Sequence, residues 1–400
     1  MIGAMPSDVP RSRPRSAATP RSLNVERVLE VLRADGPSSQ AHLARRTGLS
    51  PATVNLIVRR LREQGVAEVR RVNGREGVVA LVTGSGTFVA VDVAHDRVRG
   101  TAFAFAERTR RDAEIATSSP AAAIELVERL AEEAGTSVPE LAGVAVAMEA
   151  PIESSTDAIV GWCNSRLPAW AGVPLTSTFS AALGADVIVA NDASFAALAE
   201  WTWGVGRGSE DFLYVTADQG VGGGVVINGS IYRGGTGMAG DIGHMALEET
   251  GDVCYCGNRG CLTTLISEHA IVGAVQATPG SSISTLGDVI DAARRGDAAS
   301  QRVLAEAGHH LGRALANSAK VLAPSVIALG GALGAAGPLV FDGLLSSIEV
   351  TNMRAGSQST RFATGHIHRD GSLLGGLCAL LARSGMGVSA LEPWLVERRD

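Results

Sequence analysis

Apolar residues near the N-terminus recur at helical spacing and predict three short helices. The first carries four residues on one helical face: Val25, Val28, Leu29 and Leu32. The second is expected over 40–47, capped by Ser38 or Ser39 and stopped by Gly48. The third begins at Ser50-Pro51 and runs to about residue 64, with a second apolar stripe: Val54, Ile57, Val58 and Leu61.

A β-hairpin is predicted directly after these helices. Residues 66–71 and 78–82 contain several valines and flank Asn73-Gly74, and Asn-Gly between β-prone runs is a strong hairpin signal. Two helices joined by a glycine turn, a third helix and a hairpin form the pattern of a winged helix-turn-helix. We therefore predict such a domain over residues 23–83.

The rest of the chain shows short apolar runs typical of β-strands, separated by alanine-rich helical stretches. The expected elements are strands at 88–93, 99–106, 144–147, 187–190, 212–216, 223–228, 230–233 and 326–330, and a long helix at 298–322. Strands followed by helices occur twice along the chain. This order predicts an α/β body of two lobes, with a ligand-binding cleft between them.

Charge is distributed unevenly between these two parts. Residues 1–82 contain fourteen Arg and seven Asp or Glu, a net charge of +7, whereas residues 83–400 carry a net charge of −13. A basic head on an acidic body indicates that the head contacts a polyanion, although a soluble surface with uneven charge would show the same numbers.

The two ends of the chain are expected to be tails. Residues 1–22 hold four Arg among Pro and Ser and predict a disordered basic arm, and residues 386–400 form a C-terminal tail. The arm lacks the apolar stretch of a signal peptide, and no uncharged apolar run is long enough to span a membrane. We therefore expect a cytoplasmic protein without a membrane segment.

The exposed face of the third predicted helix carries residues expected to contact DNA, and the hairpin adds arginines. The candidate contacts are Thr53, Asn55, Arg59 and Arg60 on the helix and Arg71 and Arg75 on the hairpin. Residues near the start of such a helix reach base edges, and arginines hold phosphates, bases or a minor groove. The alternative is a helical protein-interaction module with a solvated arginine face.

Three of the five cysteines fall within eight residues, close after a histidine. The four side chains are His244, Cys254, Cys256 and Cys261. Three thiolates and one imidazole at this spacing suit a tetrahedral zinc ion, and four protein ligands leave no open position for a catalytic water. Buried free thiols are the alternative, and a disulfide would leave one cysteine of the three unpaired. We predict a structural zinc site.

Three further motifs fall at the predicted cleft. Asn191-Asp192 follows a strand and opens a helix, so its carboxylate is placed either to accept a hydroxyl proton or only to cap the helix. The glycine-rich stretch 218–224 is expected to be a turn that offers backbone N–H groups to phosphate, or simply a hairpin turn. Residues 237–244 run into the cysteine cluster, so zinc would fix the backbone that carries Asp241.

Taken together, these motifs resemble the ROK family of sugar kinases and repressors. The resembling segments are 191–200, 220–224, 241–244, 254–261 and 329–331, within a body of about 86–385. The N-terminal domain is similar to the winged helix-turn-helix of the repressor branch. The resemblance implies an actin-like, ribonuclease-H-like two-lobed fold, and zinc bound by His244, Cys254, Cys256 and Cys261.

The resemblance also implies a hexose site. In the family an Asn-Asp pair holds sugar hydroxyls, and its Asp is the catalytic base of the kinases; here the pair is Asn191 and Asp192. A Glu before Ile-Gly-His and the His itself also bind sugar, and the corresponding residues are Asp241 and His244. Asn164 is the nearest match to a further sugar-binding Asn. A second sugar-binding Glu is replaced by Thr263, which removes a contact on the anomeric side.

Two phosphate-binding loops of the kinases have diverged in this chain. The kinases carry Asp-x-Gly-Gly-Thr where this chain has residues 92–96, Asp-Val-Ala-His-Asp, and Gly-Thr-Gly where it has residues 218–220, Asp-Gln-Gly. Side chains now occupy space that backbone needs to approach phosphate, and Asp96 and Asp218 place carboxylates against polyphosphate. Repulsion of about 2 kcal/mol per carboxylate would weaken ATP binding more than tenfold.

The sequence thus predicts a ligand-responsive transcriptional repressor rather than an enzyme. It would bind operator DNA as a homodimer or homotetramer, with a sugar or sugar derivative as effector. An ATP-dependent hexose kinase with Asp192 as catalytic base is the alternative. A module that binds neither DNA nor sugar is the third possibility.

Overall fold

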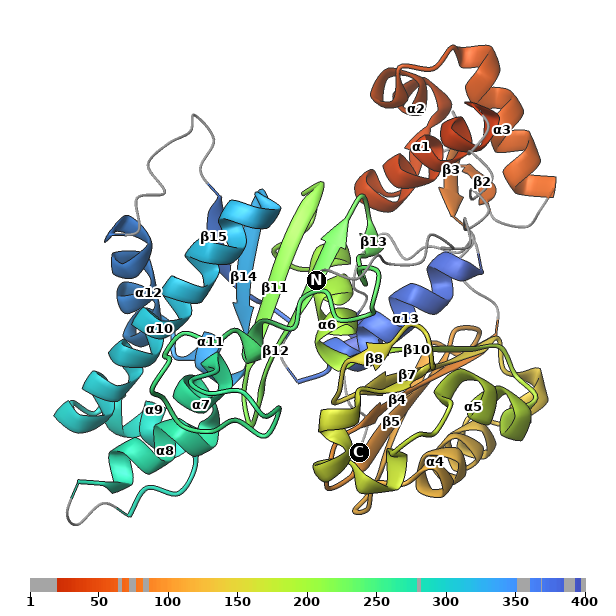
Figure 1. Cartoon of the computed structure of the whole chain (residues 1–400). Helices are drawn as coiled ribbons and strands as arrows, with labels where there is room; N and C mark the ends of the chain where they lie inside the picture. The colour runs from red at the N-terminus through yellow and green to blue at the C-terminus, as the bar shows by residue number, and fades with distance from the viewer. Residues whose placement is uncertain are drawn as a thin grey trace, which may run out of the picture. The chain divides into compact units, whose positions relative to one another are not determined.

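The computed structural model describes residues 20–63, 67–71, 77–81, 86–278, 282–350, 360–367, 369–384 and 393–396 (Figure 1). The chain divides into two compact units between Val82 and Thr83, close to the boundary predicted at residue 83. Among the described helices, none combines the length and hydrophobicity needed to cross a bilayer.

The N-terminal unit consists of the predicted helices and hairpin. Its elements are α1 (Pro20–Asp35), β1 (Ser38–Ser39), α2 (Gln40–Thr47), α3 (Pro51–Glu63), β2 (Ala67–Arg71) and β3 (Gly77–Leu81), with the sheet order β1-β3-β2. β2 and β3 pair antiparallel, as the hairpin prediction requires. Helix α1 begins at Pro20, so the predicted disordered arm is too long by its last three residues. Residues 1–19 lie outside the described part of the chain.

Local interactions define the second helix of this unit. Ser39, one of the two predicted caps, accepts a hydrogen bond from the backbone N–H of His42 at 3.2 Å, and Gly48 ends α2 with a φ of 69°. Asp35 at the end of α1 accepts hydrogen bonds from Arg46 and His42, and these bonds lower the pKa of its carboxyl group. Arg46 therefore joins α1 to α2.

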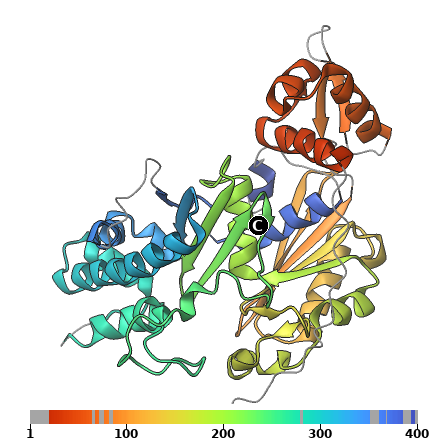
Figure 2. The ribbon, with the colours of Figure 1, turned by 45° about the horizontal axis from the view of Figure 1, so that its top comes forward.

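The C-terminal unit has two lobes whose sheets repeat one strand order. The first sheet runs β10-β7-β4-β5-β6 and the second β13-β12-β11-β14-β15. In each sheet, three neighbouring strands pair parallel with one another. The remaining two strands each pair antiparallel with the strand before them in the chain. Counted from the first strand of each lobe, both sheets have the order 3-2-1-4-5. This repeat is the predicted ribonuclease-H-like, actin-like arrangement (Figures 1 and 2).

The elements of this unit follow in chain order. The first lobe contains β4 (Thr87–Val93), β5 (Val98–Ala104), β6 (Thr109–Ile115), α4 (Pro120–Glu133), β7 (Gly143–Met148), β8 (Ile152–Glu153), β9 (Ala158–Ile159), α5 (Leu175–Leu183) and β10 (Val187–Asn191). After α6 (Asp192–Thr202), the second lobe contains β11 (Asp211–Ala217), β12 (Val221–Ile227), β13 (Ser230–Ile231), α7 (Leu262–Ile266), α8 (Glu268–Gln276), α9 (Leu286–Arg294), α10 (Ala298–Leu322), β14 (Val326–Gly330), α11 (Gly331–Ala335), α12 (Pro338–Val350) and β15 (Arg361–Thr364). The chain returns to the first lobe in α13 (Gly371–Arg383) and α14 (Pro393–Val396).

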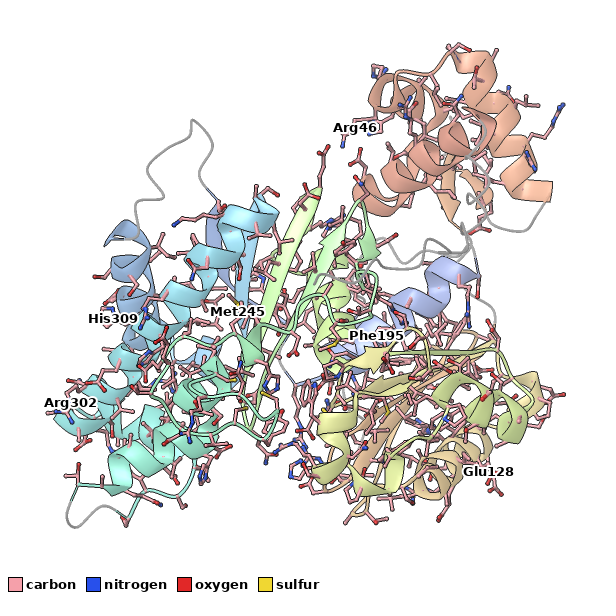
Figure 3. All side chains as sticks on the ribbon, in the orientation of Figure 1. Arg46, Glu128, Phe195, Met245, Arg302 and His309 are labelled. Carbon is pink, nitrogen blue, oxygen red and sulfur yellow. The ribbon has the colours of Figure 1, made fainter. Side chains whose placement is uncertain are left out.

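Each sheet is covered on both faces. In the first lobe, α4 and α5 pack on one face and α13 on the other. In the second lobe, α7 to α12 pack on one face and α6 on the other. Helices α6 and α13 contact each other between the two sheets, and Figure 3 shows Phe195 of α6 at this junction. The helix that starts with Asp192 is therefore buried between the lobes.

Several segments differ from the sequence prediction: β8, β9 and β15 were not predicted, and α14, whose Leu395 is fully buried, lies in the predicted C-terminal tail of residues 386–400. Strand β6 was not predicted, because charged residues dominate Thr109–Ile115; it is an edge strand, where only alternate side chains need burial. The glycine-rich stretch 218–224 was expected to be a turn, but β12 begins at Val221. Gly224 is instead a packing position, because a Cβ there would lie 2.6 Å from the Cβ of Ala197 on α6.

Candidate functional site

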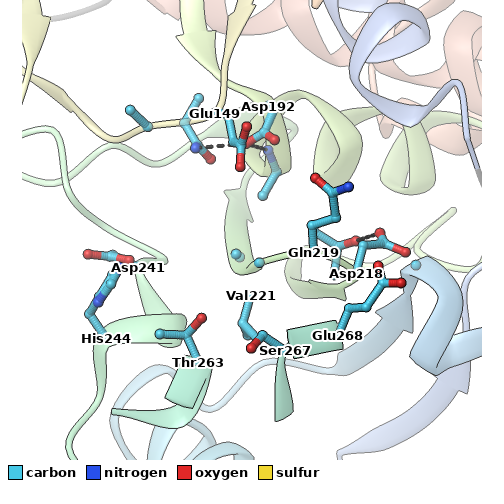
Figure 4. A pocket seen from close by; sticks show the side chains of 18 of the residues that line it. Glu149, Asp192, Asp218, Gln219, Val221, Asp241, His244, Thr263, Ser267 and Glu268 are labelled. Carbon is cyan, nitrogen blue, oxygen red and sulfur yellow. Dashed lines mark hydrogen bonds between the residues drawn. The ribbon is translucent and has the colours of Figure 1, made fainter. Parts of the chain in front are cut away.

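Three carboxylates lie where adjacent parallel strands of the first lobe end. Asp92 is near the end of β4, Glu149 follows β7 and Asp192 follows β10. The strand register places these ends at one edge of the sheet. Ligands of open α/β sheets bind beside such carboxyl ends. A cavity of about 1350 Å³ lies there, lined by residues of both lobes (Figure 4).

Asn191 and Asp192 have separate tasks at the start of α6. The side chain of Asn191 caps the helix by accepting from the N–H of Ser194 at 3.1 Å, and donates to Oδ1 of Asp192 at 2.9 Å. Asp192 lines the cavity, and burial, reinforced by Asp92 and Glu149, raises the pKa of its carboxyl group well above the ordinary value. Of the two alternatives for this motif, the capping role belongs to Asn191 and the cavity carboxylate to Asp192.

The other predicted sugar contacts are only partly brought together. Asp241, His244 and Thr263 line the cavity with Asp192 (Figure 4). Burial raises the pKa of Asp241 to about 6. Asn164 is not among the residues that line the cavity, and its buried Oδ1 has no hydrogen-bond partner among the described residues.

A charged cluster that the sequence analysis missed lies beside Asp192. Arg166 donates to Oε1 of Glu149 from Nη2 at 2.6 Å and from Nε at 3.0 Å. The backbone N–H of His95 donates to Oε2 of Glu149 at 2.8 Å, and His95 Nδ1 lies 3.0 Å from the same oxygen. Glu149 comes two residues after the predicted strand 144–147, as Asp192 does after 187–190, and that shared position is the signal that could have identified it.

The four predicted metal ligands converge. Their candidate donor atoms, from His244, Cys254, Cys256 and Cys261, all lie within 4.8 Å of one another. The sulfurs of Cys256 and Cys261 are 3.7 Å apart, and His244 Nδ1 is 3.4 Å from the sulfur of Cys254. Zinc–sulfur bonds of about 2.3 Å in a tetrahedron place sulfurs about 3.8 Å apart, so the set fits zinc. Burial lowers the pKa of His244 to about 4, which keeps its imidazole neutral and able to ligate.

Two aromatic residues surround the histidine of this cluster. The ring of Trp162 lies 4.4 Å from that of His244, centroid to centroid, and the ring of Tyr255 lies 5.0 Å away. The hydroxyl of Tyr255 is 3.1 Å from His244 Nε2. Because Nδ1 faces the cysteine sulfurs, this second contact fixes the orientation of the ring.

At the opposite end of the cavity, a carboxylate occupies the start of α11. Oδ1 of Asp218 accepts a hydrogen bond from the N–H of Ala332 at 2.6 Å, and Oδ2 accepts one from Thr216 at 3.1 Å. Gly331 has a φ of 72°, and a Cβ there would lie 2.5 Å from Asp218 Oδ2. A helix start with a glycine is where phosphate oxygens bind in many proteins. Here the Asp218 carboxylate of the protein itself occupies that position.

The first diverged phosphate loop is also occupied by the protein itself. Oδ2 of Asp92 accepts hydrogen bonds from Arg99 at 2.5 Å and from Ser372 at 2.6 Å. Asp96, expected to face polyphosphate, instead pairs with Arg97 at 3.1 Å and does not line the cavity. The expectation that Asp96 faces the cavity is therefore not met in this structure.

The N-terminal unit presents part of the predicted DNA-contacting set. Asn55, Arg59 and Arg60 are exposed on α3. Thr53 is half-buried, and its hydroxyl lies 2.8 Å from that of Ser50. Arg71 is the last residue of β2, with a side chain that is not described, and Arg75 lies outside the described residues.

Comparisons with known proteins agree with both units. The ROK family model matches residues 88–383, and a winged helix-turn-helix DNA-binding model matches residues 22–68. A glucokinase from Halalkalibacterium halodurans is 33 % identical over 253 residues, 59 % of this chain and 75 % of the glucokinase. A xylose repressor from Bacillus subtilis is 26 % identical over 339 residues, 82 % of this chain and 87 % of the repressor.

A solved structure extends the likeness over both units. It is a ROK family transcriptional regulator, a homologue of the Escherichia coli MLC protein, with a TM-score of 0.73 and 22 % identity over 91 % of this chain and 96 % of that one. The body and its motifs match throughout 88–383. This chain therefore belongs to the ROK family and carries a winged helix-turn-helix domain before its ROK body.

Proposed function

We propose that this ROK protein is a DNA-binding transcriptional repressor whose body binds a sugar or sugar derivative and does not transfer phosphate. The xylose repressor resembles 82 % of the chain, more than the C-terminal unit alone, whereas the glucokinase resembles 59 %. The proposal that the protein does not transfer phosphate is supported chiefly by the hydrogen bond from the N–H of Ala332 to Asp218. A carboxylate at that amide takes the place of a nucleotide phosphate.

ATP binding would be opposed by charge and also by the protein's own carboxylates, which already occupy the phosphate positions. To bind there, phosphate would have to displace Asp218 from Ala332 and Asp92 from Arg99. Hydrogen bonds that involve charged groups contribute about 1.5–3 kcal/mol each, so breaking them would weaken ATP binding by more than tenfold apiece. Phosphoryl transfer depends on positioned phosphate, and Asp192 alone does not supply it.

In this proposal the cavity end near the cysteines binds the effector. Asn191, Asp192, Asp241 and His244 would hold sugar hydroxyls, with Asn164 nearby. The cluster of His244, Cys254, Cys256 and Cys261 would hold a structural zinc ion, which would fix the backbone between Asp241 and the cysteines. Carboxylates with raised pKa values in a cavity are typical of ligand-binding positions.

The N-terminal unit would bind an operator through α3 and the hairpin. A homodimer or homotetramer would place paired α3 helices about one DNA turn apart, roughly 34–36 Å. An effector that prefers one arrangement of the lobes would change the affinity for DNA. The protein would act in the cytoplasm.

The DNA part is tested by gel retardation of the DNA upstream of the protein's own gene. We expect replacing both Arg59 and Arg60 with Ala to weaken binding at least tenfold and to reduce its dependence on salt. Arg302→Ala, an exposed arginine on α10, is the matched control and should bind as the wild type does. Retardation that is unchanged in the double variant would show that α3 is not the DNA-binding element.

A kinase is the second candidate, favoured by one observation. Asp192 is a cavity carboxylate of raised pKa, as a general base requires, and the glucokinase relative shares the body. Purified protein would be given ATP, magnesium and a panel of hexoses. We expect no sugar phosphate above background; turnover that disappears in Asp192→Asn would establish the kinase instead.

A further inference from the structure

The cavity extends well beyond the residues assigned to one sugar ring. From Asp241 and His244 it continues past Thr263 and Ser267 to Gln219 and Glu268, as Figure 4 shows. Its volume of about 1350 Å³ exceeds the roughly 300–1,000 Å³ typical of small-molecule pockets. The extension occupies the second lobe, on the side where Asp218 blocks the phosphate position.

This extension offers hydrogen-bonding atoms that the described part of the protein leaves available. Thr263 is only 8 % exposed, and its hydroxyl group has no hydrogen-bond partner among the described residues. The oxygen of Ser267 accepts one bond, from the N–H of Ala270, so its hydroxyl hydrogen is available. Oε1 of Glu268 accepts from the N–H of Leu286, which leaves Oε2. Gln219 is exposed and makes no side-chain hydrogen bond within the described residues.

The spacing of these groups suits a linear ligand. Thr263 lies in α7 and Ser267 follows four residues later, so the two are about one helical turn, roughly 5.4 Å, apart on the same side. Glu268 begins the next helix, and Gln219 lies in the turn between β11 and β12, with Asp218 between the two in Figure 4. Hydroxyl, carboxylate and amide groups along one part of a cavity wall can bind several hydroxyl groups of one ligand.

The charges of the extension exclude an anionic ligand there. The four arginines that line the cavity come from the first lobe and from the segment before α13: Arg97, Arg99, Arg166 and Arg369. The second-lobe lining contains four carboxylates, those of Asp218, Asp241, Asp252 and Glu268, and two histidines, His244 and His269, but no Arg or Lys. A phosphate or carboxylate at this end would meet uncompensated like charge, whereas a neutral hydroxyl group would find acceptors.

We infer that the effector contains at least two sugar rings, a neutral oligosaccharide rather than a monosaccharide, a conclusion that rests on the proposed sugar-binding function. One ring lies among Asn191, Asp192, Asp241 and His244. The next ring lies along Thr263, Ser267, Gln219 and Glu268. Thr263, shorter than the Glu of the family pattern, leaves room for the glycosidic link between the two rings.

The test is calorimetric titration of the full-length protein with matched sugars. The pairs are xylose with xylobiose, glucose with cellobiose and with maltose, and N-acetylglucosamine with its β-1,4-linked dimer; a non-hydrolysable ATP analogue with magnesium forms a separate arm. We expect at least one disaccharide to bind at least tenfold more tightly than its own monosaccharide, which corresponds to about one further well-made polar contact.

Two variants locate the second ring. Gln219→Ala removes an exposed side chain without hydrogen bonds, so its folding is secure, and Glu268→Gln retains an oxygen for the N–H of Leu286. Each should weaken disaccharide binding about fivefold to tenfold and leave monosaccharide binding unchanged. Glu306→Gln, an acid-to-amide change on the exposed side of α10, is the matched control and should alter neither.

Different results overturn different statements. If monosaccharides bind as tightly as their disaccharides, or if both variants leave the disaccharide affinity unchanged, the two-ring inference is wrong while sugar binding stands. If the ATP analogue binds and Gln219→Ala or Glu268→Gln weakens it, the extension is a nucleotide site. If no sugar in the panel binds, the proposed sugar-effector function fails and the inference fails with it.

Discussion

The two ends of the body's cavity differ in how their polar groups are engaged. Near the cysteines, Asp241 and Thr263 face the cavity without hydrogen-bond partners among the described residues. At the positions of the two diverged phosphate loops, Asp92, beside Asp192 at the edge of the first-lobe sheet, is bonded to Arg99 and Ser372, and Asp218, at the far end, to Ala332. Both ends are polar, so polarity alone does not distinguish a binding site. The difference teaches how the proposed loss of phosphate binding would arise: the protein's own side chains hydrogen-bond to the groups that would otherwise hold phosphate.

The largest expected effect comes from disrupting the metal cluster. Cys256→Ala should remove zinc and lower the free energy of unfolding by about 5 kcal/mol or more, since binding energy of a structural zinc ion is folding energy. Zinc content by atomic spectroscopy and the midpoint of thermal unfolding measure this. Cys378→Ala, a change at a buried thiol of α13, is the control and should retain the metal. Equal stability of the two variants would contradict a structural role for the cluster.

Asp192→Asn should weaken effector binding without destabilising the folded protein. A hydrogen bond to a charged group contributes about 2 kcal/mol, so the affinity for the effector should fall roughly thirtyfold. The thermal midpoint in the absence of effector should not decrease. The exposed Asp342→Asn on α12 should bind as the wild type. An Asp192→Asn protein that binds the effector normally would remove Asp192 from the site.

The same substitution gives a pH-dependent stability difference. Burial raises the pKa of Asp192 in the folded protein above the ordinary value of 3.8, so the folded state binds more protons than the unfolded state above that pH. Wild-type stability therefore decreases as pH rises from about 4 toward the raised pKa. Asn lacks this titration, so Asp192→Asn should be more stable than the wild type at neutral pH and should lose the advantage near pH 4. A pH-independent difference in unfolding free energy would show that burial does not perturb this carboxyl group.

The smallest expected effect is at the opposite end. Asp218→Ala removes the side-chain acceptor at the start of α11 and should lower the free energy of unfolding by about 1 kcal/mol. Monosaccharide affinity should not change, because Asp218 is at the far end of the cavity. Asp96→Ala, an acid that pairs with Arg97 outside the cavity, should cost less. If Asp218→Ala weakens monosaccharide binding as strongly as Asp192→Asn does, the two ends are not separate.

Sequence patterns predicted the local parts of this structure well. The apolar stripes of the head form its core, and the spacing of His244 and the three cysteines gave a converged ligand set. Chain-local periodicity and turn chemistry determine such features. Strand β6 escaped detection because an edge strand in the first lobe needs little hydrophobic patterning.

The sequence analysis missed contacts that depend on side-chain direction. Arg99 bonds to Asp92 directly across the β4–β5 hairpin, and Arg166 bonds to Glu149, and neither pair was assigned from the sequence. Asn164 and Asp96 were matched by their position in a motif, and neither is among the residues that line the cavity. Side-chain direction after a strand depends on tertiary packing, which a single sequence does not reveal.

Helix α6 starts at Asp192 and is closely packed between strand β12 and helix α13. The Cα of Gly224 in β12 lies against it on one side, and Gly375 of α13 lies against the carbonyl group of Phe195 on the other. Such backbone contacts are stiff, so a displacement of the first turn of α6 must be shared by both sheets. In the proposed repressor, an effector would signal only by displacing this turn, so tight binding and signalling would be separable. A compound that occupies part of the effector site without moving Asp192 would then act as a competitive antagonist.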